Sequence, residues 1–292
     1  MSKIKSKQRK AKIKKKVPIP FKDTDEIPPY LLRNLVDIYY DFQGQRIQTQ
    51  ARIRASKREH SLTEDELSIY GITTIFGNAQ SFEKDIERLL RNQLKNYALH
   101  NQYLVKITGI DVLLSAGLIA YIDDIEKYQH PSSLHQYAGY GGNNFCPNCK
   151  KPTFIIKEYH TGKTAKMLHP FLKCPVCNSM TEYTIQKKIS GYQINWNPRL
   201  RQVAWKVGRS FVMCSPNRCK YRKLYDKIKK KERRKNPKHT DSHIVNIAMR
   251  KTVKIFLVHL WQTWRRQQGL ETTEPYTKQL LQHSTVEAFT DD

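Results

Sequence analysis

Four cysteines, arranged as two closely spaced pairs, are the residues of this sequence whose types and spacing most directly predict chemistry. Cys146 and Cys149 form the first Cys-x-x-Cys pair, and Cys174 and Cys177 form the second. Two thiolates on one tight turn can face a single zinc ion at about 2.3 Å, and two such turns complete a tetrahedral site. The spacing therefore predicts one structural Zn²⁺ held by these four thiolates.

Short β-strands are the elements that must position such a site. The apolar and β-branched runs 153–156 and 166–173 flank a turn at His160-Thr161-Gly162, and Tyr183-Thr184-Ile185 is a candidate third strand. We therefore expect residues 145–189 to form a zinc ribbon. Two disulfides are the alternative interpretation, which we disfavour because no secretory signal opens the chain and disulfides belong to oxidising compartments.

The charge of the whole chain predicts a polyanionic partner. The 292 residues include 52 Lys+Arg and 26 Asp+Glu, a formal net charge of +26. Such an excess attracts nucleic acid first and an anionic membrane surface second. No apolar run reaches the roughly 20 residues that a membrane span requires. We expect a cytoplasmic, nucleoid-associated protein with no membrane partner, in which Cys214 and Cys219 are free thiols.

A basic arm and a pair of long helices precede the cysteines. Residues 1–16 hold nine Lys/Arg and no acid, so we expect residues 1–29 to form a disordered arm and linker. Apolar residues at helical spacing predict long helices from Tyr30 to about Lys57 and from about Ser81, with a short helix opened by a capping box at Ser61-Leu62-Thr63-Glu64. Residues 30–103 are thus expected to form a helix pair of the coiled-coil type.

The segment 104–122 has the pattern of a helix-hairpin-helix. Thr108-Gly109-Ile110-Asp111 makes the turn, Asp111 can cap the following helix, and Val112–Ile122 is apolar nearly all round, which predicts a buried helix. The amides at Gly109 are candidate contacts to a nucleic-acid phosphate. A purely structural hairpin is the alternative, because the Asp111 charge would repel phosphate.

The C-terminal third predicts helices with basic faces. Asn197-Pro198 is a helix start, and Leu200, Val203, Ala204, Val207 and Phe211 should be core. From Arg218 to Lys238 there are twelve Lys/Arg, with Tyr221 and Tyr225 interleaved as candidate stacking platforms for bases. The alternative for this segment is a solvated charged face. The candidate nucleic-acid-binding residues here are Arg199, Arg201, Lys206, Arg209, Arg218, Lys220, Arg222, Lys229, Lys230, Arg233 and Arg234.

The order of these pieces resembles the C-terminal transposase domain of the insertion sequence 110 family (110/116/902). The likeness rests on Leu104–Asp111, the apolar helix, Ser133–Tyr140 as an "ala-gly-leu" stretch, Ser190-Gly191, and Arg250-Lys251 in the last helix. The resemblance covers roughly residues 30–266 without the ribbon. The family's N-terminal RuvC-like domain has no counterpart in this sequence.

The resemblance implies DNA strand exchange guided by a structured RNA. Ser190 then matches the family's nucleophile, and a RuvC-like partner polypeptide would supply the acidic residues that bind Mg²⁺. We expect a homo-oligomer. A non-catalytic DNA- or RNA-binding protein derived from a transposase is the main alternative, and a ribosome-associated zinc protein is a third.

The expected fold is mainly helical. Residues 104–144 and 190–268 should form one helical domain that the ribbon interrupts, and residues 269–292 a flexible tail.

Overall fold

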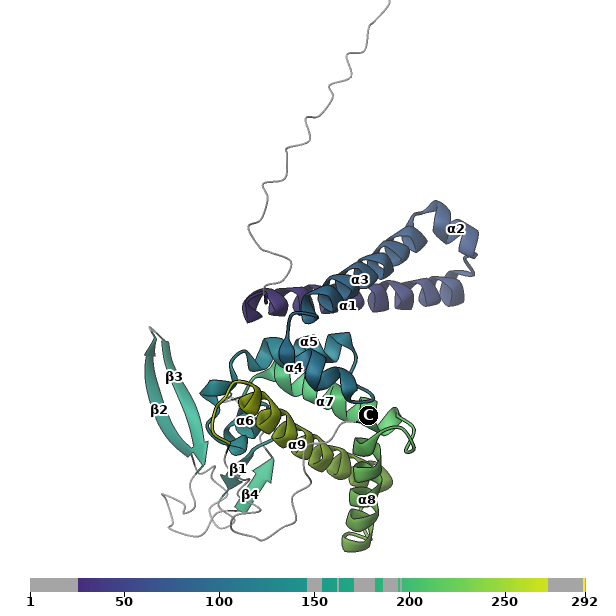
Figure 1. The fold of residues 1–292 in the computed structure, drawn as a ribbon. Helices are drawn as coiled ribbons and strands as arrows, with labels where there is room; N and C mark the ends of the chain where they lie inside the picture. The colour runs from purple at the N-terminus through teal and green to yellow at the C-terminus, as the bar shows by residue number, and fades with distance from the viewer. Residues whose placement is uncertain are drawn as a thin grey trace, which may run out of the picture.

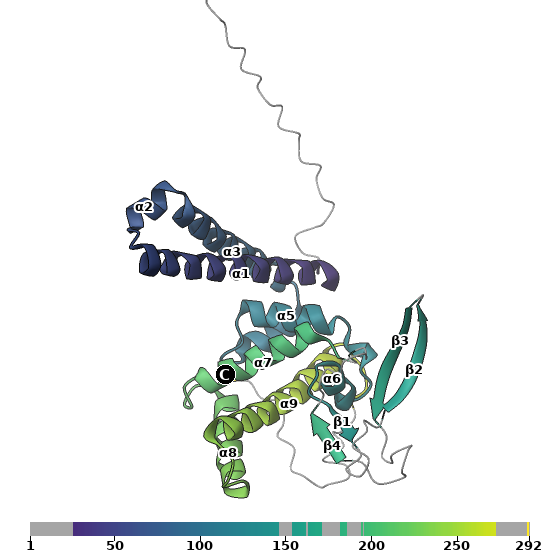
Figure 2. The same ribbon diagram turned by 180° about the vertical axis from the view of Figure 1, so that it is seen from behind.

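The protein is mainly helical, as the sequence predicts, in a computed structural model that describes residues 26–145, 154–161, 163–170, 182–185, 194, 196–272 and 291. A helical hairpin lies across a compact helical body, and two small strand pairs lie to one side (Figures 1 and 2). Within these residues no helix is long and apolar enough to cross a membrane. The four cysteines of the predicted zinc site, Ser190 and the arm at 1–25 fall outside them.

The predicted pair of long helices is confirmed. Helix α1 (Pro29–His60) packs along α3 (Ile72–Leu94), and α2 (Glu64–Ile69) turns the chain between them. The expected apolar stripes form the seam: Leu32, Ile86, Leu90 and Leu94 are buried. This burial stabilises α1, whose second half is polar and Arg-rich.

Two details of the hairpin differ from the prediction. Helix α3 begins at Ile72 rather than near Ser81, because Gly71 adopts a left-handed conformation (φ 75°) that ends α2 and starts α3 at once. Packing of Ala79 and Glu83 against α1 compensates for the weak helix formers in that first part. The capping box is Thr63 with Glu66, two residues beyond the position expected from Ser61.

Helix α5 (Val112–Ile122) is the centre of the body. It contacts α1 and α3 on one side and α7 (Pro198–Met213) on the other, and every residue from Leu114 to Ile122 is buried. As predicted, Asp111 caps it, accepting a hydrogen bond from the amide of Leu114 at 2.7 Å. The arm before the turn differs from the expectation: residues 104–106 form the 3-10 turn η1 (Leu104–Lys106) rather than an α-helix, and the short helix α4 (Ala98–Gln102) precedes it.

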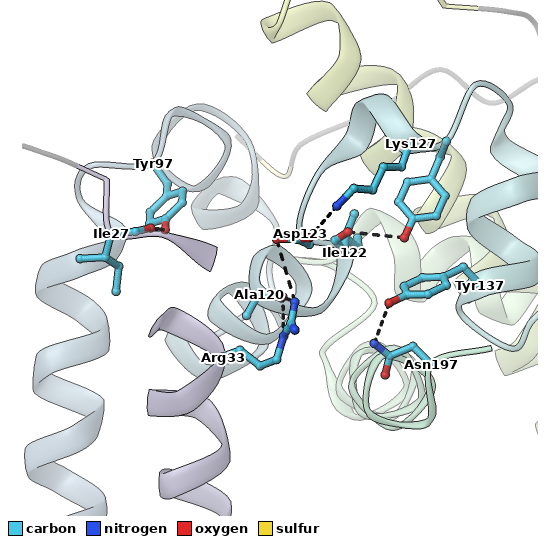
Figure 3. Close-up of polar contacts among 10 residues, drawn as sticks. Ile27, Arg33, Tyr97, Ala120, Ile122, Asp123, Lys127, Tyr137 and Asn197 are labelled. Atoms are coloured by element: carbon cyan, nitrogen blue, oxygen red, sulfur yellow. Dashed lines mark hydrogen bonds and ion pairs between the residues drawn. The ribbon is translucent and has the colours of Figure 1, made fainter. Parts of the chain in front are cut away.

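Side chains of α1 fix the hairpin to the body. Arg33 donates hydrogen bonds from Nε and Nη2 to the carbonyl of Ala120, at 3.2 and 3.0 Å (Figure 3). That carbonyl belongs to the last turn of α5, where carbonyls lack intrahelical partners. Tyr121 donates from its hydroxyl to Asp37 Oδ1 at 2.7 Å. Two adjacent residues of α5 therefore hold the hairpin in place.

The remaining helices enclose the core. After η2 (Ile125–Lys127) and α6 (Pro131–Tyr137), helix α7 begins at the predicted cap, where the side chain of Asn197 accepts from the amides of Arg199 and Leu200. The five apolar positions of α7 predicted to be core are all buried. Helices α8 (Lys220–Lys235) and α9 (Asp241–Gln267) follow, and α9 contacts α7 and α8.

Three strands form at the three predicted runs, and a fourth, β1 (Gly142–Phe145), precedes them and was not predicted. β1 pairs antiparallel with β4 (Glu182–Ile185), and β2 (Phe154–Thr161) pairs antiparallel with β3 (Lys163–Pro170). The register joins Phe145 to Glu182 and Phe154 to Pro170. Each cysteine pair therefore belongs to a connection between the same two strand pairs.

Replacing Gly208 by alanine should destabilise the body. A Cβ at Gly208 would lie 2.6 Å from Val253 Cγ2 and 2.8 Å from Met249 Cγ, both on α9. Overpacking of this kind costs about 1–3 kcal/mol, which exceeds the gain in helix propensity. Gly44→Ala is the matched control, since nothing lies within 4 Å of its Cβ, and it should raise stability by about 0.5–1 kcal/mol. Urea unfolding of both variants tests the packing, and equal shifts would contradict it.

Candidate nucleic-acid interface

A cationic groove runs between α7 and α9. It encloses about 780 Å³, and the residues just after α6 close one end of it. Four of its lining residues carry a positive side chain, and Trp205 lines it as well. The cations are Arg201 on α7 and Arg250, Lys251 and Lys254 on α9.

Helical periodicity places these side chains in rows. Arg201 and Trp205 are four residues apart on α7, and Arg250 and Lys254 are four apart on α9, so each pair shares one face of its helix. The opposite face of α9 is buried, with Ala248 and Phe256 in the core. The amphipathic helix α9 thus presents its basic row to the groove while its apolar row holds the body together.

A glycine makes room for Arg201. Gly139 has φ 72°, and a Cβ there would lie 2.8 Å from Arg201 Cδ and 3.0 Å from Trp196 Cδ1. The Arg201 guanidinium lies over the Trp196 ring, 5.5 Å from its centroid. Any larger residue at position 139 would displace the arginine from the end of the groove.

Hydrogen bonds hold the end of the groove against α9. Arg250 Nη2 donates to the carbonyls of Gly141 and Tyr140, at 2.8 and 3.2 Å. His135 Nε2 lies 2.9 Å from the carbonyl of Lys254. Burial, followed by the charge of Lys254, lowers the pKa of His135 to about 3, so this imidazole is neutral at pH 7 and donates from Nε2. The first two contacts hold the Arg250 guanidinium in place, and the third fixes the backbone of α9 at Lys254.

Positive side chains outnumber acidic ones among the described residues that line the groove. Lys251 is paired with Glu232 at 2.6 Å, but none of the lining residues that the structure describes is acidic. Burial lowers the pKa of Lys254, and the charges of Arg250 and Lys251 lower it further. A bound anion would offset this repulsion among the cations, because the attraction between opposite charges a few ångströms apart is strong in a partly desolvated site.

The cations predicted on α7 divide between two surfaces. Arg201 lines the groove, and the exposed Arg209 lies over the Trp205 ring at 5.8 Å. Arg199 pairs instead with Asp37 of the hairpin at 3.6 Å. Lys206 covers the ring of Tyr40 at 3.8 Å, and burial lowers its pKa. Arg199 and Lys206 therefore contact α1.

The tyrosines of the basic segment are not available to stack on bases, contrary to the sequence interpretation. Tyr221 and Tyr225 are 0% and 2% exposed. Tyr221 stacks on Phe211 and shares a hydrogen bond of 2.8 Å with His259 Nδ1. The segment forms an amphipathic helix, so its aromatic residues face α7 and α9 while its lysines face outward.

The predicted cations of this segment lie in different environments. Arg222 donates to the carbonyls of Val212 and Cys214 and pairs with Asp226 at 2.9 Å, so it holds the α7–α8 connection. Arg233 pairs with Asp241. The other predicted cations of the segment are exposed or partly exposed: Arg218, Lys220, Lys229, Lys230 and Arg234.

The turn at Gly109 packs against the end of α7. Gly109 has φ 99°, and a Cβ there would meet Cys214 Sγ at 2.9 Å and Ser210 Oγ at 3.0 Å. Ser210 donates to the Gly109 carbonyl at 2.6 Å, and the amide of Thr108 donates to Asp291 Oδ2 at 2.8 Å. Packing by itself accounts for the glycine, which favours the structural alternative for this hairpin.

The two remaining cysteines are free and lie beside that turn. The amide of Arg222 donates to Cys219 Sγ at 3.4 Å, which makes this thiol the cap of α8. Cys219 Sγ also contacts the carbonyl of Thr108 at 3.3 Å. Burial raises the pKa of Cys219 to about 11, so it is a protonated, structural thiol. In the parts of the chain that are described, no three His, Cys, Asp or Glu side chains gather as a metal site.

Sequence reasoning did not assign Trp205 or Lys254 to a binding site, and used Arg250 and Lys251 only for the family resemblance. Their signal was present as two rows at i, i+4 spacing, one on α7 and one on α9. The packing of α7 against α9 then brings both rows to one groove.

Comparison with known proteins adds no family assignment. No protein-family model matches this sequence, and no curated protein sequence matches it either.

Proposed function

We propose that this protein binds nucleic acid and that the groove between α7 and α9 holds the phosphate backbone. The observation that carries the proposal is the groove's cation cluster, which has no acidic residue in its described lining. Phosphate groups are the anions that pair best with such a cluster, arginine by two parallel hydrogen bonds and lysine as a point charge. The net charge of +26 supports a polyanion over a small anion.

A zinc ribbon is proposed for residues 145–189, with Cys146, Cys149, Cys174 and Cys177 as ligands. The described residues support this proposal by the way the chain connects the strands. Both cysteine pairs lie in segments that begin and end at the same paired strand ends, Phe145 with Glu182 and Phe154 with Pro170. When bound, a structural Zn²⁺ would crosslink those two connections, a means of stabilising so small a β-unit.

Within this binding function we propose a role in DNA strand exchange, as the resemblance to the insertion sequence 110 family implies. Ser190 would be the nucleophile, and it lies in the connection between β4 and α7. Because Arg201 belongs to the first turns of α7, that connection leads directly to the groove. A structured RNA and a RuvC-like partner that binds Mg²⁺ would complete the site. Binding without catalysis is the alternative.

Lys254→Met should weaken nucleic-acid binding while leaving the fold intact. We expect about a tenfold loss of affinity, the loss of one charge-assisted contact, and a salt dependence shallower by roughly one phosphate. The pKa of Lys254 is lowered in the folded state, so its charge destabilises the fold at neutral pH and the variant should melt slightly higher. Fluorescence anisotropy over a salt series and thermal melts measure both effects.

Lys84→Met is the control for that experiment, because Lys84 is an exposed lysine on α3, away from the groove. Lys84→Met should lower the affinity, and reduce its salt dependence, by less than Lys254→Met does. Binding by the wild type that does not depend on salt would contradict the proposal, as would equal losses in the two variants.

The purified chain should contain one zinc ion per molecule. Elemental analysis of wild type, Cys149→Ser and Cys177→Ser tests this, and both variants should lose the metal because a tetrahedral site needs all four thiolates. Cys214→Ala is the control, since Cys214 lies at the end of α7 and should leave the zinc in place. A metal-free wild type would refute the ribbon.

Ser190→Ala should abolish a covalent protein–DNA adduct. Wild type would be incubated with Mg²⁺, RNA and target DNA from its own locus and a RuvC-like partner, and adducts resolved on a denaturing gel. Ser132→Ala, at an exposed position on α6, should behave as wild type. An adduct that persists in Ser190→Ala would exclude this nucleophile, and its absence from every protein would favour binding without catalysis.

A further inference from the structure

Trp205 is the most exposed of the tryptophans. The chain has four tryptophans. Trp196, Trp261 and Trp264 are 8%, 0% and 7% exposed, whereas Trp205 is 49% exposed. Single exposed apolar residues are common on protein surfaces, but this one lines the cationic groove. It therefore offers a flat apolar surface within reach of any ligand that the groove's cations hold.

The surroundings of the ring determine which ligand fits. Arg209, the next residue on that face of α7, lies over the ring at 5.8 Å, and Arg201 lies one turn before it. Arg250 and Lys254 face it from α9. An aromatic platform surrounded by cations is the arrangement that binds single-stranded nucleic acid, in which a base stacks on the ring and neighbouring phosphates pair with the cations.

Duplex nucleic acid makes poorer use of this arrangement. In a duplex the bases already stack on one another, and only phosphates and groove edges are accessible to a side chain in a helix–helix groove. An acidic protein surface would pair with the cations, but it carries no planar base to stack on the Trp205 ring. An unpaired nucleotide uses both the ring and the charges.

We propose that the α7–α9 groove selects unpaired nucleic acid, with a base stacked on Trp205 and its flanking phosphates at Arg201, Arg250 and Lys254. This inference rests on the proposed nucleic-acid-binding function and assigns that site its class of ligand. Strand exchange passes through unpaired DNA, so a single-strand groove would serve it whether this chain or a partner breaks the strands.

The intact protein provides its own reporter. Because three of the four tryptophans are buried, a ligand that stacks on Trp205 should quench that component of the tryptophan fluorescence. The probes are an oligothymidylate, which lacks internal pairing, and a mixed-sequence duplex of equal length, each titrated at the same salt concentration. The proteins are wild type, Trp205→Ala, Trp205→Phe and the control Tyr70→Ala, whose ring is 71% exposed on the hairpin.

We expect oligothymidylate to quench the wild type and Tyr70→Ala, and to leave Trp205→Ala and Trp205→Phe unquenched. Trp205→Ala should lose roughly 5- to 150-fold in affinity for oligothymidylate, the range found for one stacked base, and little for the duplex. Trp205→Phe should retain most of the single-strand affinity, because a smaller ring still stacks.

Two results would overturn the inference while leaving nucleic-acid binding intact. One is a Trp205→Ala protein that binds both probes as wild type does or loses affinity equally for both. The other is quenching that persists in Trp205→Ala. A wild type that binds neither probe at low salt would instead refute the proposed function itself. Thermal melts of each variant exclude misfolding, which is not expected at a half-exposed position.

Discussion

Close approach of helix backbones at two glycines is the constraint on which the rest of the structure depends. Val203 of α7 fills the space that Gly117 leaves on α5, where a Cβ would lie 2.9 Å from Val203 Cγ2. On the other side of α7, Gly208 admits Val253 and Met249 of α9. Helix α7 is therefore held between two neighbours by contacts that larger residues would not permit. Its orientation decides which of its cations meet the groove and which meet the hairpin.

The distribution of charge follows from that orientation. Arg199 and Lys206 face α1, where Asp37 and the Tyr40 ring receive them. Arg201 faces the groove together with the basic row of α9. Burial, followed by the like charges of Arg250 and Lys251, lowers the pKa of Lys254, so keeping this lysine charged in the groove costs stability. A protein that maintains such a cluster at the expense of its own stability is expected to use it for binding, because an anionic ligand reverses the cost.

The proposed functions join at the start of α7. The β4–α7 connection that contains Ser190 leads to the cap at Asn197, whose side-chain amide also donates to the hydroxyl of Tyr137 at 3.0 Å (Figure 3). Arg201 and Trp205 follow within the next two turns. The connection that contains Ser190 therefore ends at Pro198, which lines the groove. The proposed zinc ribbon precedes that segment in the chain, between α6 and α7.

Local signals in the sequence determined much of the helical framework. The caps at Asp111 and Asn197, the buried helix 112–122 and the core positions of α7 depend on hydrogen bonds within one turn and on apolar periodicity, which operate over a few residues. The two cysteine pairs likewise predict zinc by spacing alone, independently of the described residues. The start of α3 was not predicted, because its first residues have low helix propensity. Packing against α1 stabilises them as a helix.

Only the tertiary structure decided where the proposed binding surface lies. The sequence composition predicted nucleic-acid contacts at the basic segment 218–238 and its tyrosines. In the structure Tyr221 and Tyr225 are buried against neighbouring helices. The groove instead combines one row from α7 with one from α9, about 50 residues apart in the chain. A sequence states which faces of a helix are basic or apolar, but the partner helix decides which of them is covered. Here the close packing of α7 between α5 and α9 left Trp205 and four cations facing one groove.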